Sequence, residues 1–228
     1  MTESEAFYPP RLSGTQMDAF LAIGWYRMGQ AFFTTDAIMH KEEIFKVFWL
    51  RYNLQKVGPE KKSNAKIIEN NSRFEATIQP LEVTEEMDNL YELYKAGINF
   101  EGAASIEQWL YEGKPRNVFD SYSVTVRDNG TLIAVGIFDK GKKAIAGILN
   151  FYNPLYKKYS PGKYLMLLKI KYAQQDNIKW YYPGYIVPGY PKFDYKLFVD
   201  KLAAEIYIPK AKAWKGYNEM LVKTLTGC

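Results

Sequence analysis

The sequence predicts an α+β fold, arranged as an α/β three-layer structure with a mixed, mostly antiparallel central sheet. Apolar residues at helical spacing mark segments near residues 87–98 and 160–172. Between them, the segments 122–126, 131–138 and 144–152 have the alternating or continuous apolar character of strands. Helices before and after a run of strands are expected to cover the two faces of one sheet.

The first 72 residues are expected to form an N-terminal region, and residues 73–228 a separate C-terminal domain. A helix is predicted over residues 16–23 and a strand over residues 45–54. Residues 58–71 are polar and charged and contain few large apolar side chains. That composition predicts a loop or linker at the boundary.

The C-terminal domain opens with an amphipathic helix, whose apolar side chains are Met87, Leu90, Tyr91, Tyr94 and Ile98. Ser105 and Gln108 have the spacing of a capping box, which predicts the start of a second helix.

Three strands follow as an antiparallel meander, because the sequence Asp128-Asn129-Gly130 is a strong turn signal between the first two. Ser160 and Pro161 suit the N-cap and first turn of a long helix. A last strand is predicted over residues 178–182, ended by Pro183-Gly184.

Composition limits the functions that this chain can have. The net charge of +5 suits a polyanionic partner such as RNA, although the excess is mild. The one cysteine, Cys228, excludes a disulfide or a cysteine-based metal cluster within the chain. The acidic, polar residues 1–10 do not form a signal peptide, and no apolar run approaches the roughly 20 residues of a membrane span. We therefore expect a cytoplasmic protein without membrane association and without a cofactor.

Several motifs in one order resemble a known family. They are residues 24–29 (GWYRMG), 128–139 (DNGTLIAVGIFD), 150–154 (NFYNP), 159–162 (YSPG) and 181–196 (YYPGYIVPGYPKFDYK). In these the sequence resembles the aminoacyl-tRNA–protein transferases, which comprise arginyltransferases and bacterial aspartate/glutamate leucyltransferases. The resemblance implies a GNAT-like acyltransferase fold, the layout that the predicted element order also matches, preceded by a family-specific N-terminal region.

The resemblance also implies a reaction. An amino acid, Arg or Leu, moves from aminoacyl-tRNA to the N-terminal α-amino group of an acceptor protein with an acidic first residue, which tags that protein for degradation. An apolar donor pocket would indicate Leu, and an acidic one Arg. The family commonly carries a cysteine cluster soon after its early Gly-aromatic-Arg motif, but residues 34–40 (TTDAIMH) contain none, so no metal cluster is expected there.

Such a reaction is the aminolysis of an activated ester and needs no covalent enzyme intermediate. An α-amino group has a pKa of roughly 7.7–8.0, so a useful fraction is neutral near pH 7. Positioning and stabilisation of an oxyanion could then supply most of the catalysis. This chemistry suits a chain with one histidine and no usable cysteine.

Candidate catalytic residues are Ser160 and Gly162, at the predicted helix start, and Tyr185 in a Tyr-rich loop. Free N–H groups at a helix N-terminus favour an anion or oxyanion, although a plain N-cap with a tight turn explains the same residues. Asp139 is expected to be structural rather than a proton carrier.

Candidate substrate-binding residues are of two kinds. Arg27 and Arg51 could pair with an acidic target side chain, or form structural ion pairs or stack on neighbouring tryptophans. Tyrosines could stack the terminal adenine and lysines could bind phosphates or a carboxylate, unless the segment is only a rigid Pro/Gly loop. These residues are Tyr152, Tyr182, Lys192, Tyr195 and Lys196.

Two other functions stay open. An acyl-CoA-dependent acyltransferase needs a Gly-rich pyrophosphate loop, but residues 159–162 offer one glycine and no arginine. A non-catalytic relative would bind tRNA or N-terminal peptides without transfer. Bulky side chains filling the space beside Gly162 and Tyr185 would exclude an aminoacyl group and favour the non-catalytic relative.

Overall fold

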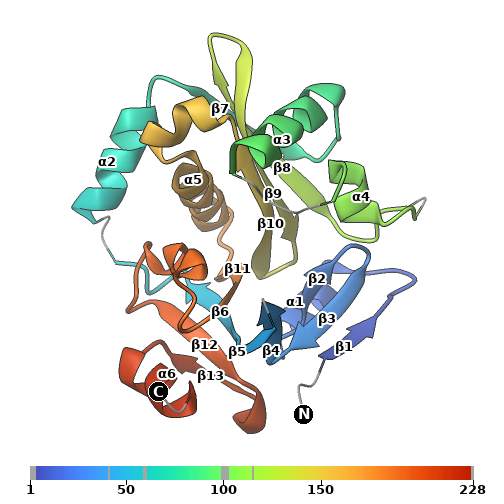
Figure 1. Ribbon diagram of the computed structural model, residues 1–228, viewed down its shortest axis with the longest axis vertical. Coiled ribbons are helices and arrows are strands. Elements are labelled where there is room, and N and C mark those ends of the chain that lie inside the picture. The colour runs from blue at the N-terminus through green and yellow to red at the C-terminus, as the bar shows by residue number, and fades with distance from the viewer. Residues whose placement is uncertain (1–3, 41, 59–60, 99–102, 115, 227–228) are drawn as a thin grey trace.

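The computed structural model describes residues 4–40, 42–58, 61–98, 103–114 and 116–226. Its centre is an eight-stranded sheet in the order β13-β12-β6-β11-β10-β9-β8-β7 (Figure 1). The strands are β6 (Phe48–Asn53), β7 (Glu75–Pro80), β8 (Ser121–Asp128), β9 (Thr131–Lys140), β10 (Ala144–Tyr152), β11 (Trp180–Ile186), β12 (Ala204–Ile208) and β13 (Ala213–Gly216). Strands β10 and β11 are parallel and the other neighbours are antiparallel, which confirms the predicted mixed sheet.

The predicted meander is confirmed as β8, β9 and β10. At its first turn Asn129 and Gly130 have φ angles of 47° and 82°. Two consecutive positive φ angles are those of a type I′ turn, whose twist matches the flanking strands.

Helices cover both faces of the sheet, which confirms the three-layer plan (Figure 1). On one face lie α2 (Lys62–Asn71) and α5 (Pro161–Gln175), and on the other α3 (Glu85–Ile98) and α4 (Ile106–Tyr111). From Ala134 on, side chains of β9 alternate between the layers: Ala134 and Phe138 join the core under α5, while Val135 joins the core under α3.

The N-terminal region adds smaller elements. They are α1 (Gly14–Ala22), a three-stranded sheet of β1 (Ser4–Phe7), β3 (Ala31–Thr35) and β2 (Tyr26–Met28), and a hairpin of β4 (Ala37–His40) and β5 (Glu43–Lys46). The helix predicted over 16–23 is confirmed as α1. The strand predicted over 45–54 is divided at Val47, so that β5 ends in the hairpin and β6 begins in the central sheet.

The prediction of a loop over residues 58–71 was wrong, because residues 62–71 form α2. Two partly buried isoleucines, Ile67 and Ile68, pack on the core. Buried amides also bind the helix to the rest of the fold: Asn71 donates to the carbonyl oxygen of Tyr159 at 2.8 Å, and Asn64 to that of Val199 at 3.2 Å. Since β6 pairs with β11 and β12, part of the first 72 residues belongs to the central sheet, and the division at residue 72 stays a prediction.

Two other boundaries differ from expectation. Strand β11 does not end at Pro183-Gly184 but continues to Ile186, with a register irregularity between Tyr181 and Gly184 that accommodates the proline. Ser160 precedes α5 in a left-handed conformation (φ 55°) and its side chain forms no capping hydrogen bond. Elements without a predicted counterpart are η1 (Pro154–Tyr159), η2 (Pro191–Leu197), η3 (Pro209–Ala211) and α6 (Glu219–Thr226), together with β1 to β4, β7, β12 and β13.

None of the helices in the described part of the chain is long and apolar enough to cross a membrane.

Candidate functional site

Strands β10 and β11 separate in the middle of the sheet. They pair from Ala144 opposite Trp180 to Ala146 opposite Tyr182, and the pairing stops there. Just beyond, β10 has a register irregularity between Gly147 and Leu149. A cavity of about 1430 Å³ opens at this point, lined by residues of β2, β10, β11 and η2 and of α4 with the segment after it.

The Tyr26 side chain lies between β10 and β11 at the point where they separate. Its hydroxyl proton is shared between the carbonyl oxygens of Gly147, on β10, and Tyr182, on β11, the latter at 2.9 Å. The Trp49 ring stacks on Tyr26 with centroids 5.1 Å apart. The N-terminal region thereby supplies a hydrogen-bond donor to two carbonyl groups. In a continuous sheet, such groups would accept from the neighbouring strand.

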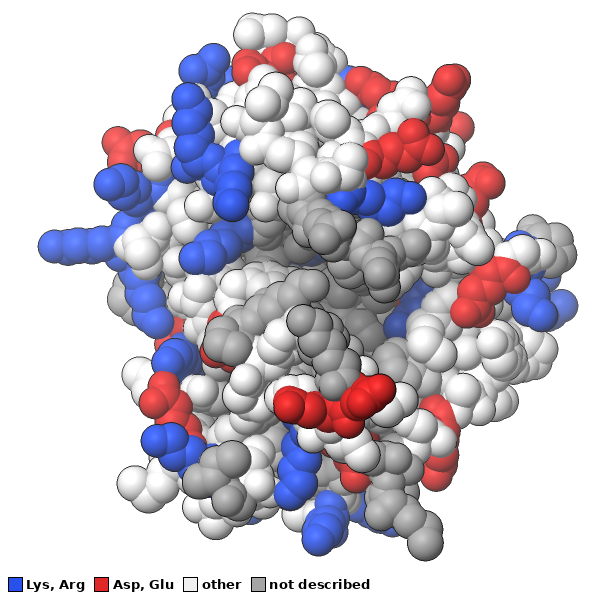
Figure 2. All heavy atoms as spheres, viewed as in Figure 1, with Lys and Arg blue, Asp and Glu red and all other residues white. Residues whose placement is uncertain are grey.

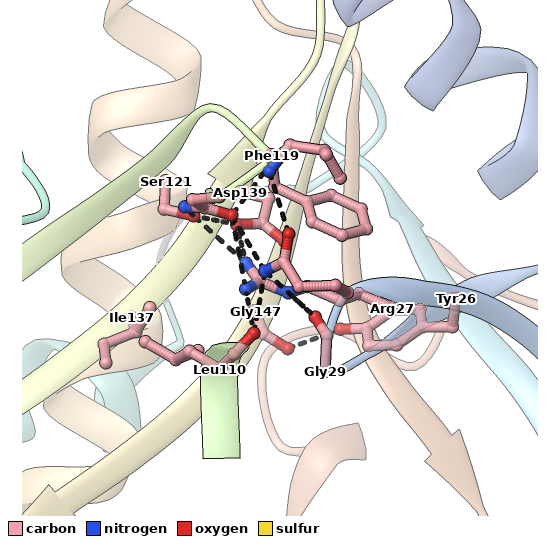
Figure 3. A network of polar contacts seen from close by, with 12 residues as sticks. Tyr26, Arg27, Gly29, Leu110, Phe119, Ser121, Ile137, Asp139 and Gly147 are labelled. Atoms are coloured by element: carbon pink, nitrogen blue, oxygen red, sulfur yellow. Dashed lines mark hydrogen bonds and ion pairs between the residues drawn. The ribbon is translucent and has the colours of Figure 1, made fainter. Parts of the chain in front are cut away.

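Arg27 anchors β2 through a buried network (Figure 3). Its five N–H groups face five acceptors: the carbonyl oxygens of Gly29 and Leu110, the side chains of Ser121 and Asn117, and Asp139 Oδ1 at 2.8 Å. The guanidinium also lies 4.3 Å from the centroid of the Phe119 ring. With every donor occupied, Arg27 positions the cavity wall, and direct substrate binding by it stays a prediction.

Asp139 is fully buried beside Arg27 and accepts a second hydrogen bond from the Ser121 hydroxyl at 2.6 Å. Burial raises the pKa of Asp139, and the positive charge of Arg27 opposes that rise. Its contacts are those of a structural anchor, as expected from the sequence.

Lys196 brings an amine into the cavity. Its Nζ donates to the carbonyl oxygen of Tyr185 at 2.8 Å and lies 4.9 Å and 5.0 Å from the ring centroids of Phe193 and Tyr185. It forms no ion pair with a carboxylate of the described residues. Burial lowers the pKa of Lys196 to about 7, so a neutral amine is available near neutral pH.

Gly184 makes room for this amine. Its φ of +100° lies in a region that side chains disfavour, and a Cβ there would stand 3.3 Å from Lys196 Nζ.

A second buried lysine lies behind the cavity wall. Lys169 Nζ donates to the carbonyl oxygen of Ile137 at 2.9 Å and to Asn150 Oδ1 at 2.8 Å, and Asn150 lines the cavity. Desolvation lowers the pKa of Lys169 to about 7. Sequence reasoning missed Lys169, although its spacing of four from Leu165 and three from Tyr172 places it in the buried stripe of the helix.

The structure brings some of the predicted residues together. Tyr185, Tyr195, Lys196 and Arg27 line the cavity. Ser160, Gly162 and Tyr152 are not among the lining residues: Ser160 and Gly162 lie at the start of α5, and the Tyr152 ring packs on Tyr94 with centroids 5.1 Å apart. Their catalytic and binding roles stay predictions.

Arg51 and Tyr182 also lie outside the cavity wall. Arg51 pairs with Glu205 at 2.6 Å and lies between the rings of Trp180 and Trp214, 3.7 Å and 4.4 Å from their centroids. The ion pair is the structural alternative that the sequence left open, but the rings are those of Trp180 and Trp214 rather than of the neighbouring Trp49. The side chain of Lys192 lies outside the described part of the structure.

The cavity residues that were not among the predicted site residues include Tyr26, Lys114, Asn150 and Tyr181. Tyr26, Asn150 and Tyr181 fall inside quoted motifs, which was the available signal. Nothing in the sequence distinguishes Lys114. No group of three or more His, Cys, Asp or Glu side chains in the described residues is arranged to hold a metal ion.

Comparisons with known proteins agree with this geometry. Residues 81–202 match the family model described as "Arginine-tRNA-protein transferase, C terminus". The chain is 26% identical over 214 residues to an aspartate/glutamate leucyltransferase of Leptospira interrogans, covering 86% of this chain and 81% of that protein. It is 28% identical over 206 residues to one of Xylella fastidiosa, covering 87% of this chain and 78% of that protein.

Among solved structures, FemX shares the fold, with a TM-score of 0.53 over 97% of this chain and 74% of that one at 9% sequence identity. The three layers and the separated parallel pair β10 and β11 make the fold GNAT-like, as expected. The family model spans more than half of the 228 residues, from the start of α3 to the segment after η2. The chain therefore belongs to the arginine-tRNA-protein transferase family.

Proposed function

We propose that this protein transfers leucine from aminoacyl-tRNA to the α-amino group of a protein whose first residue is Asp or Glu, a tag that marks the acceptor for degradation. One observation carries the proposal. A member of this family holds a partly buried amine, Lys196, in a large cavity at the point where β10 and β11 separate.

The apolar part of the cavity lining supports leucine as the transferred residue. Met166, Ile148 and Phe193 give an apolar wall, whereas the acidic lining residues, Glu107 and Glu112, lie on and just after α4. An arginine side chain would require a buried acidic partner in the donor pocket. The curated relatives that match most of the chain are named as leucyltransferases, which also favours leucine.

In the proposed reaction, the neutral α-amino group of the acceptor attacks the ester carbonyl of the aminoacyl-tRNA. The new C–N bond forms, and the C–O bond to the 3′ ribose breaks. Lys196, in its neutral form, accepts the proton that the attacking nitrogen loses and returns it to the leaving ribose oxygen. No other reactant is needed, because the ester is already activated.

The separated edge of β10 is the proposed oxyanion site. Beyond Ala146 this edge has lost its partner strand, and Gly147, Ile148 and Leu149 line the cavity. A fixed backbone N–H donor here would stabilise the oxygen that becomes negative during attack.

Lys114 is the proposed contact for the acceptor's acidic side chain. Among the described residues, the cationic side chains that line the cavity are those of Arg27, Lys114 and Lys196. The donors of Arg27 are occupied, and Lys196 is partly buried and hydrogen-bonded to Tyr185, whereas Lys114 is exposed at the α4 side. An exposed ammonium attracts a carboxylate at modest desolvation cost.

A transfer assay tests the proposal. Purified protein is incubated with radiolabelled Leu-tRNA or Arg-tRNA and with peptides that begin with Asp, Glu or Ala. Label from Leu-tRNA alone, entering the Asp and Glu peptides but not the Ala peptide, supports it. Label from Arg-tRNA would show that arginine, not leucine, is the transferred residue. If neither tRNA gives label while tRNA still binds, the non-catalytic alternative is supported.

A further inference from the structure

Six lysines gather on one flank of the molecule, and we call them the basic face. They are Lys61, Lys62 and Lys66 on α2 and its N-cap, Lys157 and Lys158 on η1, and Lys163 in the first turn of α5. All except Lys163 are exposed. Helix α2 packs against both η1 and α5, so these residues share one surface, and Figure 2 shows positive side chains concentrated over that flank.

The lysines of the basic face lack acidic partners. None of the six forms an ion pair with a carboxylate in the described residues, and Glu69 is the acidic residue on α2. Three other lysines, Lys56, Lys140 and Lys201, do form ion pairs among the described residues, as Lys140 does with Asp176 at 2.6 Å. Unpaired like charges held close together repel one another, and a polyanion would relieve that repulsion.

The opposite flank carries acidic side chains. The first turn of α3 alone contains Glu85, Glu86 and Asp88, and Figure 2 shows negative side chains over the α3 flank. A net charge of +5 divided in this way creates a field that orients an approaching polyanion toward the basic face.

A second cavity, of about 660 Å³, lies beside the basic face. Its wall contains the aromatic side chains of Tyr195, Phe198 and Tyr217 and the lysines Lys163, Lys201 and Lys223. Its acidic members are Asp194 and Glu219, and Glu219 pairs with Lys201 at 2.7 Å. Aromatic rings between cations are the chemistry that binds unpaired nucleotides, by stacking bases and contacting phosphates.

Two residues connect these features into one path. Lys163 belongs to the basic face and also lines the second cavity. Tyr195 lines both the second cavity and the main cavity that holds Lys196. A polynucleotide chain that leaves the basic face at Lys163 would therefore pass the second cavity before it reaches Lys196.

We propose that the basic face binds the phosphate backbone of the tRNA acceptor arm and that the second cavity takes its unpaired 3′ nucleotides. The aminoacyl ester is thereby delivered past Tyr195 into the main cavity. This inference rests on the proposed function, because it assumes that tRNA is the donor.

The basic face is tested by binding of fluorescent, uncharged tRNA over a range of salt concentrations. The variant is Lys62→Gln/Lys66→Gln/Lys158→Gln. The control, Lys210→Gln/Lys212→Gln/Lys215→Gln, removes the same charge at exposed positions on the β12–β13 side, at the other end of the molecule (Figure 1). We expect the variant to bind at least about tenfold more weakly, with a salt dependence reduced by about two to three units, and the control to bind as the unaltered protein does.

The second cavity is tested with two tRNAs, one intact and one trimmed of its unpaired 3′ nucleotides. Tyr217→Ala should weaken binding of the intact tRNA several-fold and leave the trimmed tRNA unaffected. Tyr217→Phe keeps the ring and should bind both as the unaltered protein does. Thermal unfolding of both variants reports whether either has lost the fold.

The outcomes separate this inference from the proposed function. If the unaltered protein binds tRNA but the variant and the control bind it equally more weakly, the assignment of the basic face to tRNA is overturned. The proposed function then stands. If the variant loses binding of acidic acceptor peptides and keeps tRNA, the face belongs to the acceptor and the inference is overturned. If the unaltered protein binds no tRNA at all, both fail.

Discussion

Lys196 Nζ lies 2.8 Å from the carbonyl oxygen of Tyr185 and has no carboxylate partner among the described side chains. This hydrogen bond joins η2 to β11 inside the cavity and holds the amine among aromatic rings. Removal from water lowers the pKa of Lys196 to about 7, which favours the neutral amine, the form that accepts a proton.

Replacing Lys196 should therefore slow transfer without releasing tRNA. For Lys196→Met we expect a loss of about 10²–10⁴-fold in the single-turnover rate, because a general base is lost. Lys196→Arg should be similarly slow, since a guanidinium stays protonated. The exposed Lys210→Met serves as control, and full activity in Lys196→Met would exclude Lys196 as the proton acceptor.

The pH dependence of transfer should carry the signature of Lys196. Because its pKa is lowered to about 7, the fraction of neutral amine rises through that pH and the rate rises with it. The acceptor amine titrates separately at roughly 7.7–8.0. In single-turnover profiles, Lys196→Met should lose the inflection near pH 7 and keep the one from the acceptor; an unchanged profile contradicts the assignment.

Lys169 should make stability depend on pH. Its pKa in the folded protein, about 7, is below the ordinary lysine value of 10.5. Between these two pKa values the unfolded chain binds more protons than the folded protein, so the free energy of unfolding rises with pH. Below pH 7 the destabilisation caused by burying this lysine is fully present. Lys196 acts in the same sense.

The measurement is urea unfolding at several pH values between 7 and 10. Lys169→Met should show a shallower rise of unfolding free energy than the unaltered protein, because one of the two amines is gone. Equal slopes would mean that Lys169 is not desolvated in the folded state.

Breaking the Arg27–Asp139 ion pair should strongly lower the free energy of unfolding. Arg27→Met leaves the Asp139 carboxylate buried without a counter-charge, and we expect a loss of about 3–5 kcal/mol in unfolding free energy. The double variant Arg27→Met/Asp139→Asn should recover part of that loss, since it also removes the buried charge. Additive losses in a double-mutant cycle would contradict coupling between the two residues.

Lys114 should act on acceptor selection alone. Lys114→Gln should raise KM for Asp and Glu peptides several-fold, at an unchanged rate with saturating peptide, because an exposed ion pair contributes about 0.2–1 kcal/mol. Lys210→Gln is the matched control. An equal rise for peptides that begin with Ala would show that Lys114 does not read the acidic side chain.

Local sequence patterns predicted the elements that are stabilised locally. The Asn129-Gly130 turn, the meander and the apolar stripe of α5 depend on residues close together in the chain, and all three are confirmed. Helix α2 was missed because its stability depends on distant partners, such as the carbonyl group of Tyr159, which accepts from Asn71.

The site was only partly predictable for the same reason. The tyrosines and Lys196 lie in one sequence motif, so their grouping could be expected. The role of Arg27 is set by Asp139, 112 residues away, and no spacing rule connects them. The cavity itself exists because β10 and β11 separate after Ala146, which is a property of the sheet rather than of either strand.

The most direct test of this account is mass spectrometry of a peptide that begins with Asp, after incubation with Leu-tRNA and the protein. A matched peptide with an acetylated α-amino group, and a reaction with acetyl-CoA in place of tRNA, are the controls. The account predicts one leucine added to the N-terminus of the free peptide and no product in either control. An unmodified free peptide, or an acetylated product from acetyl-CoA, would contradict it.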